Sequence, residues 1–474
     1  MTTSRSPMSP GVQPVKHLSR RTFLAGAAAV AGFPYIVPGN ALGKNGRAAA
    51  SERITIGVIG TGSRGINDLD GLMNSPLSQI VAVCDCRQPR LEAAKIRVDK
   101  FYAGQSPAGT SGGCKAYHDF REVIDRKDLD VIQVTTPDHW HGIVATRALQ
   151  AGKDLYCEKP LGRTIAESIA IRDAAVKHKR IFQTGTQQRS DAKFRQAVAL
   201  ARGGYLGKIR TIEVAVPAGG DMVKAPPCPV PAGFDYDMWT GPAPMHPFDA
   251  KRCEWLAMYW IADYCVGFIC NWGIHHLDIA AWGCPEVAEA PFELEGTGFL
   301  PTEGMCSTIA TWRCMYRFPS GLTMSFTSDK GPFDWQKNQG LTPECSRHFK
   351  ALDLSKYHET GCRFIGSEGW VHVTRGAISA EPASLLSREL DPAAHGVVKS
   401  DDHYVNFLEA VRDRREPVSP VASGHRATVL GNAADIAVRL GKKLKWDPRA
   451  EQFVGDDEAN KRLAQPMRAP WRMG

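Results

Sequence analysis

Strand and helix patterns alternate from residue 54 to residue 188 of the chain. Short apolar segments that predict strands lie at 54–59, 80–85, 129–136, 154–160 and 180–188. Helical patterns lie between them, at 63–74, 91–101, 120–125, 143–150 and 166–178. Strands and helices in alternation predict an α/β fold with a parallel, doubly wound sheet, whose ligand binds at the carboxyl ends of the strands.

The rest of the chain shows a different pattern. Period-two alternation predicts strands at 211–216, 308–318, 322–326, 362–374 and 377–383, and amphipathic helices at 403–413 and 427–444. These elements predict a second, α+β domain. We therefore divide the chain into an export signal and linker (1–50), a Rossmann domain (51–186), an α+β domain for substrate and oligomer contacts (187–447) and a surface-wrapping tail (448–474).

Composition agrees with a soluble protein of two domains plus extensions. The 474 residues are 43% hydrophobic and 23% charged, which excludes disordered and fibrous classes. The first 50 residues contribute six of the eight net positive charges. Because the remaining chain is almost neutral and has no basic tract, we expect no nucleic-acid partner.

The first 50 residues have the pattern of an export signal. Arg20 and Arg21 precede an apolar run that is too short to span a bilayer comfortably, and small residues suited to a peptidase follow. This predicts export of the folded protein to the periplasm by the twin-arginine route, without stable membrane insertion. The alternative is an amphipathic or disordered arm.

Neither a disulfide framework nor a metal site is expected. The thirteen cysteines form no CxxC pair. His275 and His276 are adjacent, so on a helix they cannot share a face as two metal ligands would.

A glycine-rich turn follows the first predicted strand. Gly60, Gly62 and Gly65 have GxGxxG spacing, and Asp85 ends the next strand twenty residues later. In such a turn, glycines permit a tight bend, the approach of a pyrophosphate and close helix packing, while the acid binds a ribose. Asp85 favours NAD; the nearby Arg64 and Arg87 leave NADP open.

Four motifs stand in a specific order: GTGSRG (60–65), TTPDHWH (135–141), CEKPLG (157–162) and GIHHLD (273–278). Together they resemble the Gfo/Idh/MocA family of nicotinamide-dependent oxidoreductases over roughly residues 53–447. The resemblance implies a Rossmann domain, a second domain with a large, mostly antiparallel sheet, and homo-oligomers, dimers or tetramers, joined through that sheet. The cofactor-binding residues that we predict are Gly60, Thr61, Gly62, Ser63, Arg64, Gly65, Asp85, Thr136, Pro137, His139, Glu158 and Lys159.

Lys159 and His275 are the predicted catalytic residues. A lysine at the end of a central strand, beside a positively charged nicotinamide, has its pKa lowered by burial and by the like charge, which suits proton relay. By resemblance, His275 is the general base, since a neutral imidazole accepts a hydroxyl proton. The alternative for Lys159 is an ordinary surface lysine at the end of a strand. The alternative for His275 is a core histidine whose hydrogen bonds are satisfied within the protein.

Asn271 departs from the family's D-x-G-x-H-x-x-D segment, in which Gly273, His275 and Asp278 match. It also suits the N-cap of a helix from about residue 272 to 282. An amide binds a hydroxyl but cannot accept its proton. Either turnover is lower or shifted in pH, or the reaction is something other than simple alcohol oxidation. Asp263 is a candidate for the missing charge.

The segment 234–282 predicts the class of substrate. Its eleven aromatic residues include Trp239, Trp255, Trp260 and Tyr264, which can stack on sugar rings or form core. We predict Asn271, Asp278, Gln187, Arg189 and Trp239 as substrate-binding residues. Gln187 and Arg189 are equally compatible with a polar hinge.

These patterns predict an exported oxidoreductase that moves a hydride between tightly bound NAD(P) and a hydroxyl or keto carbon of a carbohydrate or polyol. One alternative is NAD-dependent, redox-assisted glycoside cleavage. The other is a non-catalytic, NAD-loaded carbohydrate-binding protein, for which Asn271 is the main argument.

Overall fold

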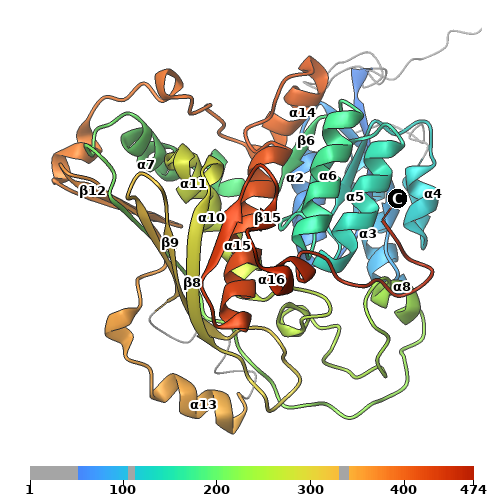
Figure 1. Ribbon diagram of the computed structural model, residues 1–474. Coiled ribbons are helices and arrows are strands. Elements are labelled where there is room, and N and C mark those ends of the chain that lie inside the picture. Colours follow the sequence, from blue (N-terminus) through green and yellow to red (C-terminus); the bar gives the residue numbers. More distant parts are fainter. Residues whose placement is uncertain (1–51, 105–112, 330–340, 474) are drawn as a thin grey trace, which may run out of the picture.

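The computed structural model describes residues 52–104, 113–329 and 341–473, and it consists of two units side by side (Figure 1). The predicted export signal at 1–50 lies outside the described residues.

The first unit is built on a parallel sheet. Its strands are β1 (Ile54–Ile59), β2 (Ser78–Cys84), β3 (Lys115–Tyr117), β4 (Val131–Val134), β5 (Asp154–Cys157) and β6 (Phe182–Thr184). They lie in the order β3-β2-β1-β4-β5-β6, and every pair is parallel. The order reverses between β1 and β4, where a doubly wound sheet opens a crevice for a ligand.

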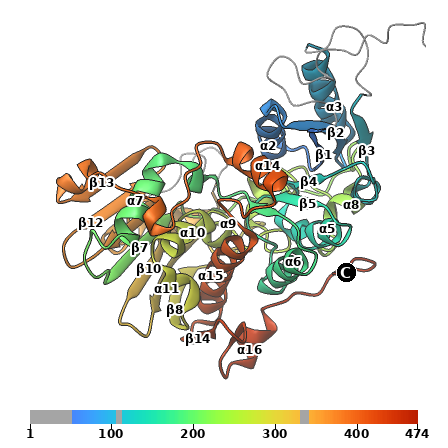
Figure 2. The same cartoon turned by 90° about the horizontal axis from the view of Figure 1, so that it is seen from above.

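Helices connect these strands and cover both faces of the sheet (Figure 2). They are α2 (Ser63–Asn74), α3 (Gln88–Ala103), α4 (Phe120–Ile124), α5 (Asp138–Gln150) and α6 (Ile165–Lys177). The helix predicted from residue 143 begins five residues earlier, at Asp138. Eleven of the thirteen residues of α5 are buried, so its sequence lacks the polar face by which a helix start is recognised.

The second unit holds a large sheet. Its strands are β7 (Thr211–Val216), β8 (Phe292–Phe299), β9 (Thr311–Arg317), β10 (Thr323–Ser328), β11 (Gly361–Ile365), β12 (Trp370–Thr374), β13 (Ala377–Glu381), β14 (Leu444–Asp447) and β15 (Gln452–Phe453). The order is β13-β12-β11-β7-β10-β9-β8-β14-β15. Only β7 and β10 pair in parallel, so the prediction of a large, mostly antiparallel sheet is confirmed.

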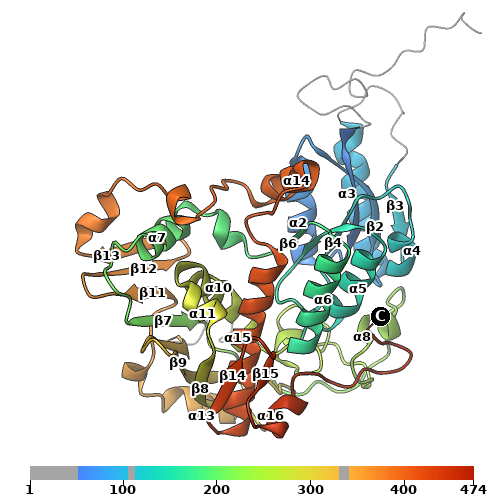
Figure 3. The same ribbon diagram turned by 45° about the horizontal axis from the view of Figure 1, so that its top comes forward.

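The remaining helices follow β6 in the chain; most accompany the large sheet, whereas α14 packs on α2 of the first unit. They are η3 (Gln187–Ser190), α7 (Ala192–Arg202), α8 (Tyr236–Thr240), η4 (Ala257–Trp260), α9 (Phe268–Asn271), α10 (Gly273–Gly283), α11 (Pro285–Glu289), α13 (Pro343–Lys350), η5 (Leu354–Lys356), η6 (Ala383–Ser387), η7 (Ala393–His395), α14 (His403–Asp413), α15 (Val421–Leu440) and α16 (Asp457–Lys461). Helix α15 lies between the units and packs on α6, α10 and β8 (Figure 3).

Strand β8 was not predicted from the sequence. Gly296 and Gly298 interrupt its alternation, and glycine weakens a strand pattern. In the structure a Cβ at either position would lie within 2.8 Å of Val438 on α15. The two glycines therefore let the central helix pack closely on the sheet.

The C-terminal segment returns to the first unit. After β15 and α16, Arg468 binds Asp237 at 2.7 Å and the carbonyl oxygen of Gly241 at 2.9 Å. Trp471 then packs edge-on against Trp140 of α5, with ring centroids 4.7 Å apart. The segment thus joins the turn after α8 to the Rossmann helices.

We predict that Trp471→Ala lowers the free energy of unfolding by about 3 kcal/mol, because it leaves a cavity beside Trp140. Trp255→Ala is the control: Trp255 is 58% exposed, and its removal should change stability by no more than about 0.5 kcal/mol. Urea denaturation measures both variants, and equal losses would contradict the assigned packing.

Candidate active site

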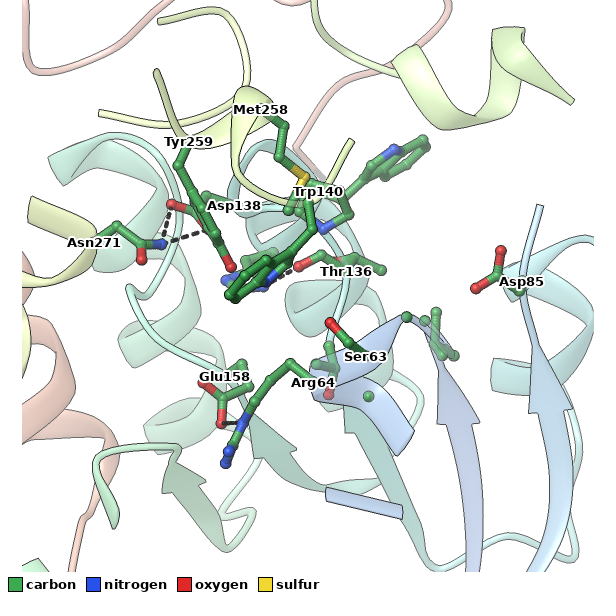
Figure 4. Close-up of a pocket in the computed structure, with 18 of the residues that line it drawn as sticks. Ser63, Arg64, Asp85, Thr136, Asp138, Trp140, Glu158, Met258, Tyr259 and Asn271 are labelled. Atoms are coloured by element: carbon green, nitrogen blue, oxygen red, sulfur yellow. Dashed lines mark hydrogen bonds and ion pairs between the residues drawn. The ribbon is translucent and has the colours of Figure 1, made fainter. Parts of the chain in front are cut away.

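A cavity of about 600 Å³ lies at the carboxyl ends of β1, β2, β4 and β5, between the two units. Figure 4 shows its wall, with Ser63, Asp85 and Glu158 from the first unit and Tyr259 and Asn271 from the second. Of the predicted cofactor residues, all but Thr61 and His139 line this cavity.

The glycine turn has the shape that a dinucleotide requires. Gly60 has a φ of +90°, and a Cβ there would lie 2.4 Å from the carbonyl oxygen of Thr135. A Cβ at Gly65 would lie 2.1 Å from the carbonyl oxygen of Gly60. Gly62 is the N-cap of α2, so the positive end of the helix dipole faces the cavity. These residues fit a bound pyrophosphate.

Asp85 is held in position beside this turn. One carboxylate oxygen accepts hydrogen bonds from the backbone N–H and the hydroxyl of Thr61, both at 2.9 Å, and the other accepts the backbone N–H of Arg87. Thr61 thus orients Asp85 without lining the cavity. The carboxylate stands where an adenosine ribose binds in Rossmann folds.

Arg64 and Arg87 are the two arginines whose closeness to Asp85 in the sequence made NADP a possible cofactor. In the structure both guanidinium groups contact other residues. Arg87 donates to the carbonyl oxygen of Cys253 and stacks over Phe234 at 4.1 Å. Arg64 pairs with Glu158 at 3.0 Å and with Asp68 at 2.6 Å. The geometry at Asp85 therefore fits NAD.

Glu158 links two other residues that line the cavity. It accepts a hydrogen bond from Arg64 Nε at 3.0 Å (Figure 4). It also accepts one from Gln187 Nε2 at 2.7 Å. Burial raises the pKa of Glu158, but Arg64 and Lys159 outweigh burial and hold the pKa below its ordinary value. Gln187 lines the cavity as predicted, with its amide nitrogen occupied by Glu158 and Tyr156.

Lys159 reaches across the cavity to the second unit. Its ammonium donates to the side-chain and backbone oxygens of Asn271, at 2.8 and 3.0 Å. The Asn271 amide nitrogen donates in turn to Asp138, at 3.0 and 3.2 Å. Burial lowers the pKa of Lys159, while Glu158 and Asp138 oppose that shift.

Two expectations about Asn271 were wrong. It is the last residue of α9 and does not cap α10, because its side chain is already bound to Lys159 and Asp138. Asp263 does not supply the missing charge, since it pairs with His246 at 2.8 Å. The nearby carboxylate is Asp138, which the longer α5 brings into the site.

The adjacent histidines face different surroundings, as their spacing predicts. His276 is fully buried between Phe194 and Trp272, and burial lowers its pKa to about 3. His275 lines the cavity. Burial, with Lys159 and Arg375 nearby, holds the pKa of His275 well below its ordinary value. Its imidazole is therefore neutral near pH 7.

Some predicted residues lie behind the cavity wall. Arg189 and Asp278 do not line it, and they form a buried ion pair with two hydrogen bonds of 2.7 Å. This pair fixes α10 to η3 one turn after His275. His139 is also buried outside the cavity, with its Nε2 against the carbonyl oxygen of Trp239.

The aromatic wall differs in composition from the prediction. Trp239 and Trp255 line the cavity, whereas Trp260 and Tyr264 are core residues with no exposed surface. Tyr259 and Arg375 line it as well, and the sequence analysis missed them. Arg375 lies in a hairpin turn about a hundred residues after His275, and no motif marks it.

Within the described residues, no helix has the length and hydropathy needed to cross a membrane. No cluster of three or more histidine, cysteine or acidic side chains in the same residues could hold a metal ion. All thirteen cysteines are unpaired.

The parallel sheet, the glycine turn and Asp85 define a dinucleotide-binding protein. Residues 54–186 match the Gfo/Idh/MocA profile described as "Oxidoreductase family, NAD-binding Rossmann fold". Residues 219–330 and 387–473 match the companion profile, "Oxidoreductase family, C-terminal alpha/beta domain". The chain belongs to this family. Because the second match reaches residue 473, the expectation that the resemblance ends near 447 was wrong.

Curated relatives match part of the chain. Inositol 2-dehydrogenase of Salmonella typhimurium is 34% identical over 154 residues, which are 32% of this chain and 42% of that protein. Glycosyl hydrolase family 109 protein 2 of Shewanella sp. (strain ANA-3) is 32% identical over 124 residues, 26% of each chain. The chain thus spans less than half of these relatives' length.

Solved structures share the fold over most of the chain. Aldose-aldose oxidoreductase from Caulobacter crescentus, complexed with glycerol, has a TM-score of 0.55 at 20% identity and covers 83% of this chain and 99% of its own. Levoglucosan dehydrogenase, in complex with NADH and levoglucosan, has a TM-score of 0.54 at 16% identity, with the same coverage.

We predict that Asp278→Asn lowers the free energy of unfolding by about 3–5 kcal/mol, because it leaves the buried Arg189 guanidinium without its counter-charge. Glu295→Gln removes one partner of a half-exposed pair with Arg317 and should cost no more than about 1 kcal/mol. Urea denaturation of both variants tests this, and equal effects would refute it.

Proposed function

We propose that this protein is an oxidoreductase that transfers a hydride between bound NAD and a hydroxyl or keto carbon of a carbohydrate or polyol. The observation that carries the proposal is the arrangement of Lys159 and the neutral His275 in the same cavity as the glycine turn. A proton acceptor and a hydrogen-bond donor are what an alcohol needs at the carbon that is oxidised.

Each residue has a distinct part in this chemistry. Bound NAD supplies the hydride acceptor. His275 accepts the proton that leaves the hydroxyl, because its pKa is too low for it to be protonated already. Lys159 holds the same oxygen through the N–H that Asn271 does not use, and Asn271 keeps the ammonium in place.

The substrate class rests on the cavity wall and on the relatives. Trp239, Trp255 and Tyr259 line the cavity with aromatic rings on which a sugar can stack. The similar proteins are named for inositol, aldoses and levoglucosan. A polyhydroxy ring or chain therefore suits the space beside His275.

Tight retention of the cofactor is part of the proposal. The segment after β7 covers the chain just past Asp85: Gln88 N–H donates to Gly233 at 2.7 Å, and Asp235 N–H donates to Cys86 at 2.9 Å. The segment is therefore fixed beside the predicted adenosine site by backbone hydrogen bonds and by the stacking of Arg87 on Phe234, which supports tight retention. Tight binding suits a protein exported already folded to the periplasm, as Arg20 and Arg21 predict.

We also propose that the protein forms a homo-oligomer, whose subunits associate through the large sheet.

Redox-assisted glycoside cleavage is the second candidate, favoured by the similarity to glycosyl hydrolase family 109 proteins. It uses the same oxidised carbon to acidify a neighbour and regenerates NAD within one cycle. Release of an aryl leaving group with no net reduction of the nicotinamide would distinguish it.

The function is tested on the purified, signal-free protein by identifying the released nucleotide by mass, then following nicotinamide absorbance after addition of a panel of sugars and polyols. We expect NAD to co-purify and one sugar class to reduce it. Lys159→Met should slow this reduction about 100-fold while NAD stays bound.

Lys208→Met is the matched control, because Lys208 is exposed and lies outside the cavity. It should react at the wild-type rate. The proposal fails if no nucleotide binds, or if Lys159→Met and wild type react equally fast.

A further inference from the structure

Arg375 enters the cavity from the far side of the second unit. It lies with Gly376 in the two-residue turn between β12 and β13, and Gly376 has the φ of +90° that such a tight turn needs. The hairpin brings the arginine to the cavity wall beside Trp272 and His275.

The guanidinium is held in a fixed orientation. It lies over the ring of Trp272 at 4.4 Å. With the Gln188 amide oriented to satisfy its neighbours, the oxygen accepts from Arg375 Nε at 3.2 Å and the nitrogen donates to the carbonyl oxygen of His275 at 2.8 Å. Gln188 thus couples the position of Arg375 to the backbone of His275.

Arg375 is less occupied by protein partners than Arg64 and Lys159, the two other cations near His275. Arg64 pairs with Glu158 and Asp68, and Lys159 is bound to Asn271 next to Asp138. No ion pair forms between Arg375 and any acidic side chain of the described residues. In the same part of the chain, its two terminal nitrogens donate to no protein atom. Partial removal of the guanidinium from water and the Arg64 charge lower the pKa of Arg375, whereas Glu158 opposes this shift. The residue as a whole remains exposed, so an anion in the cavity can reach the guanidinium.

We propose that Arg375 determines specificity by binding the carboxylate of an acidic sugar, a uronic or aldonic acid, whose hydroxyl carbon reacts at His275. This inference rests on the proposed function and narrows its substrate class. A carboxylate fits because the guanidinium's planar fork matches it with two parallel hydrogen bonds. A single guanidinium neutralises one negative charge, which favours a carboxylate over a doubly charged phosphate ester.

The test compares matched sugars on the NAD-loaded protein: D-glucuronate against D-glucose, D-galacturonate against D-galactose, and D-glucose 6-phosphate as the phosphate arm. The readout is the ratio of kcat/KM for the acid to kcat/KM for the neutral sugar. We expect the acid to be preferred and Arg375→Gln to reduce this ratio about 10- to 100-fold, with Arg375→Lys between the two.

Arg388→Gln is the control, because Arg388 also lies over an aromatic ring, Tyr205 at 5.4 Å, but outside the cavity. It should leave the ratio unchanged. A ratio that does not respond to Arg375→Gln overturns the inference, and a phosphate ester preferred through Arg375 overturns the assignment to a carboxylate.

Calorimetric binding of the same sugars to the Lys159→Met protein separates this inference from the proposed function. If the wild-type protein oxidises no sugar but glucuronate or galacturonate binds to Lys159→Met in an Arg375-dependent way, the inference stands and the catalytic proposal fails. If neutral sugars are oxidised and bound without regard to Arg375, the catalytic proposal stands and the inference fails. Absence of both binding and turnover overturns both.

Discussion

The site depends on one buried charge, the ammonium of Lys159. It lies at the end of β5, where removal from water disfavours the cation. The protein compensates with two oxygens of Asn271 from the second unit, and the Asn271 amide continues to Asp138 of the first. These hydrogen bonds run from the first unit to the second and back, so Lys159, Asn271 and Asp138 link the two units at the site itself.

The hydrogen bonds of Asn271 explain why an amide suits this position better than a carboxylate. An amide can accept from Lys159 with its oxygen and donate to Asp138 with its nitrogen at once, whereas a carboxylate at 271 would face Asp138 as a like charge. Asp138 supplies a negative charge to this chain of hydrogen bonds while residue 271 is neutral. The departure from the family pattern is thus compatible with catalysis and does not require a binding-only protein.

The features that the sequence predicted are those encoded locally. The glycine turn, five of the six strands of the first sheet and the different surroundings of His275 and His276 follow from spacing and helix geometry, whereas the short β3 was missed and the role of His275 came from the family resemblance. The start of α5 was hidden because nearly all of that helix is buried, and β8 because its glycines serve contact with α15.

Long-range pairings could not be predicted from one sequence. Arg189 carries the same charge whether it binds a substrate or Asp278, and only the packing of η3 on α10 decides. Arg375 reaches the cavity because a hairpin turn ends there, and strand registers over the whole sheet determine that position. The family profiles likewise assign the two units but not these contacts.

The most direct test of the central interaction is to titrate the Lys159 ammonium by NMR, with isotope-labelled lysine, in the wild type and in Asp138→Asn. Asparagine at 138 can still accept from Asn271 but carries no charge. The account predicts a lower Lys159 pKa in the variant, because the protonated lysine loses the attraction of Asp138 while its burial is unchanged. An unchanged or higher pKa would show that Asp138 does not stabilise the buried ammonium and would contradict the account.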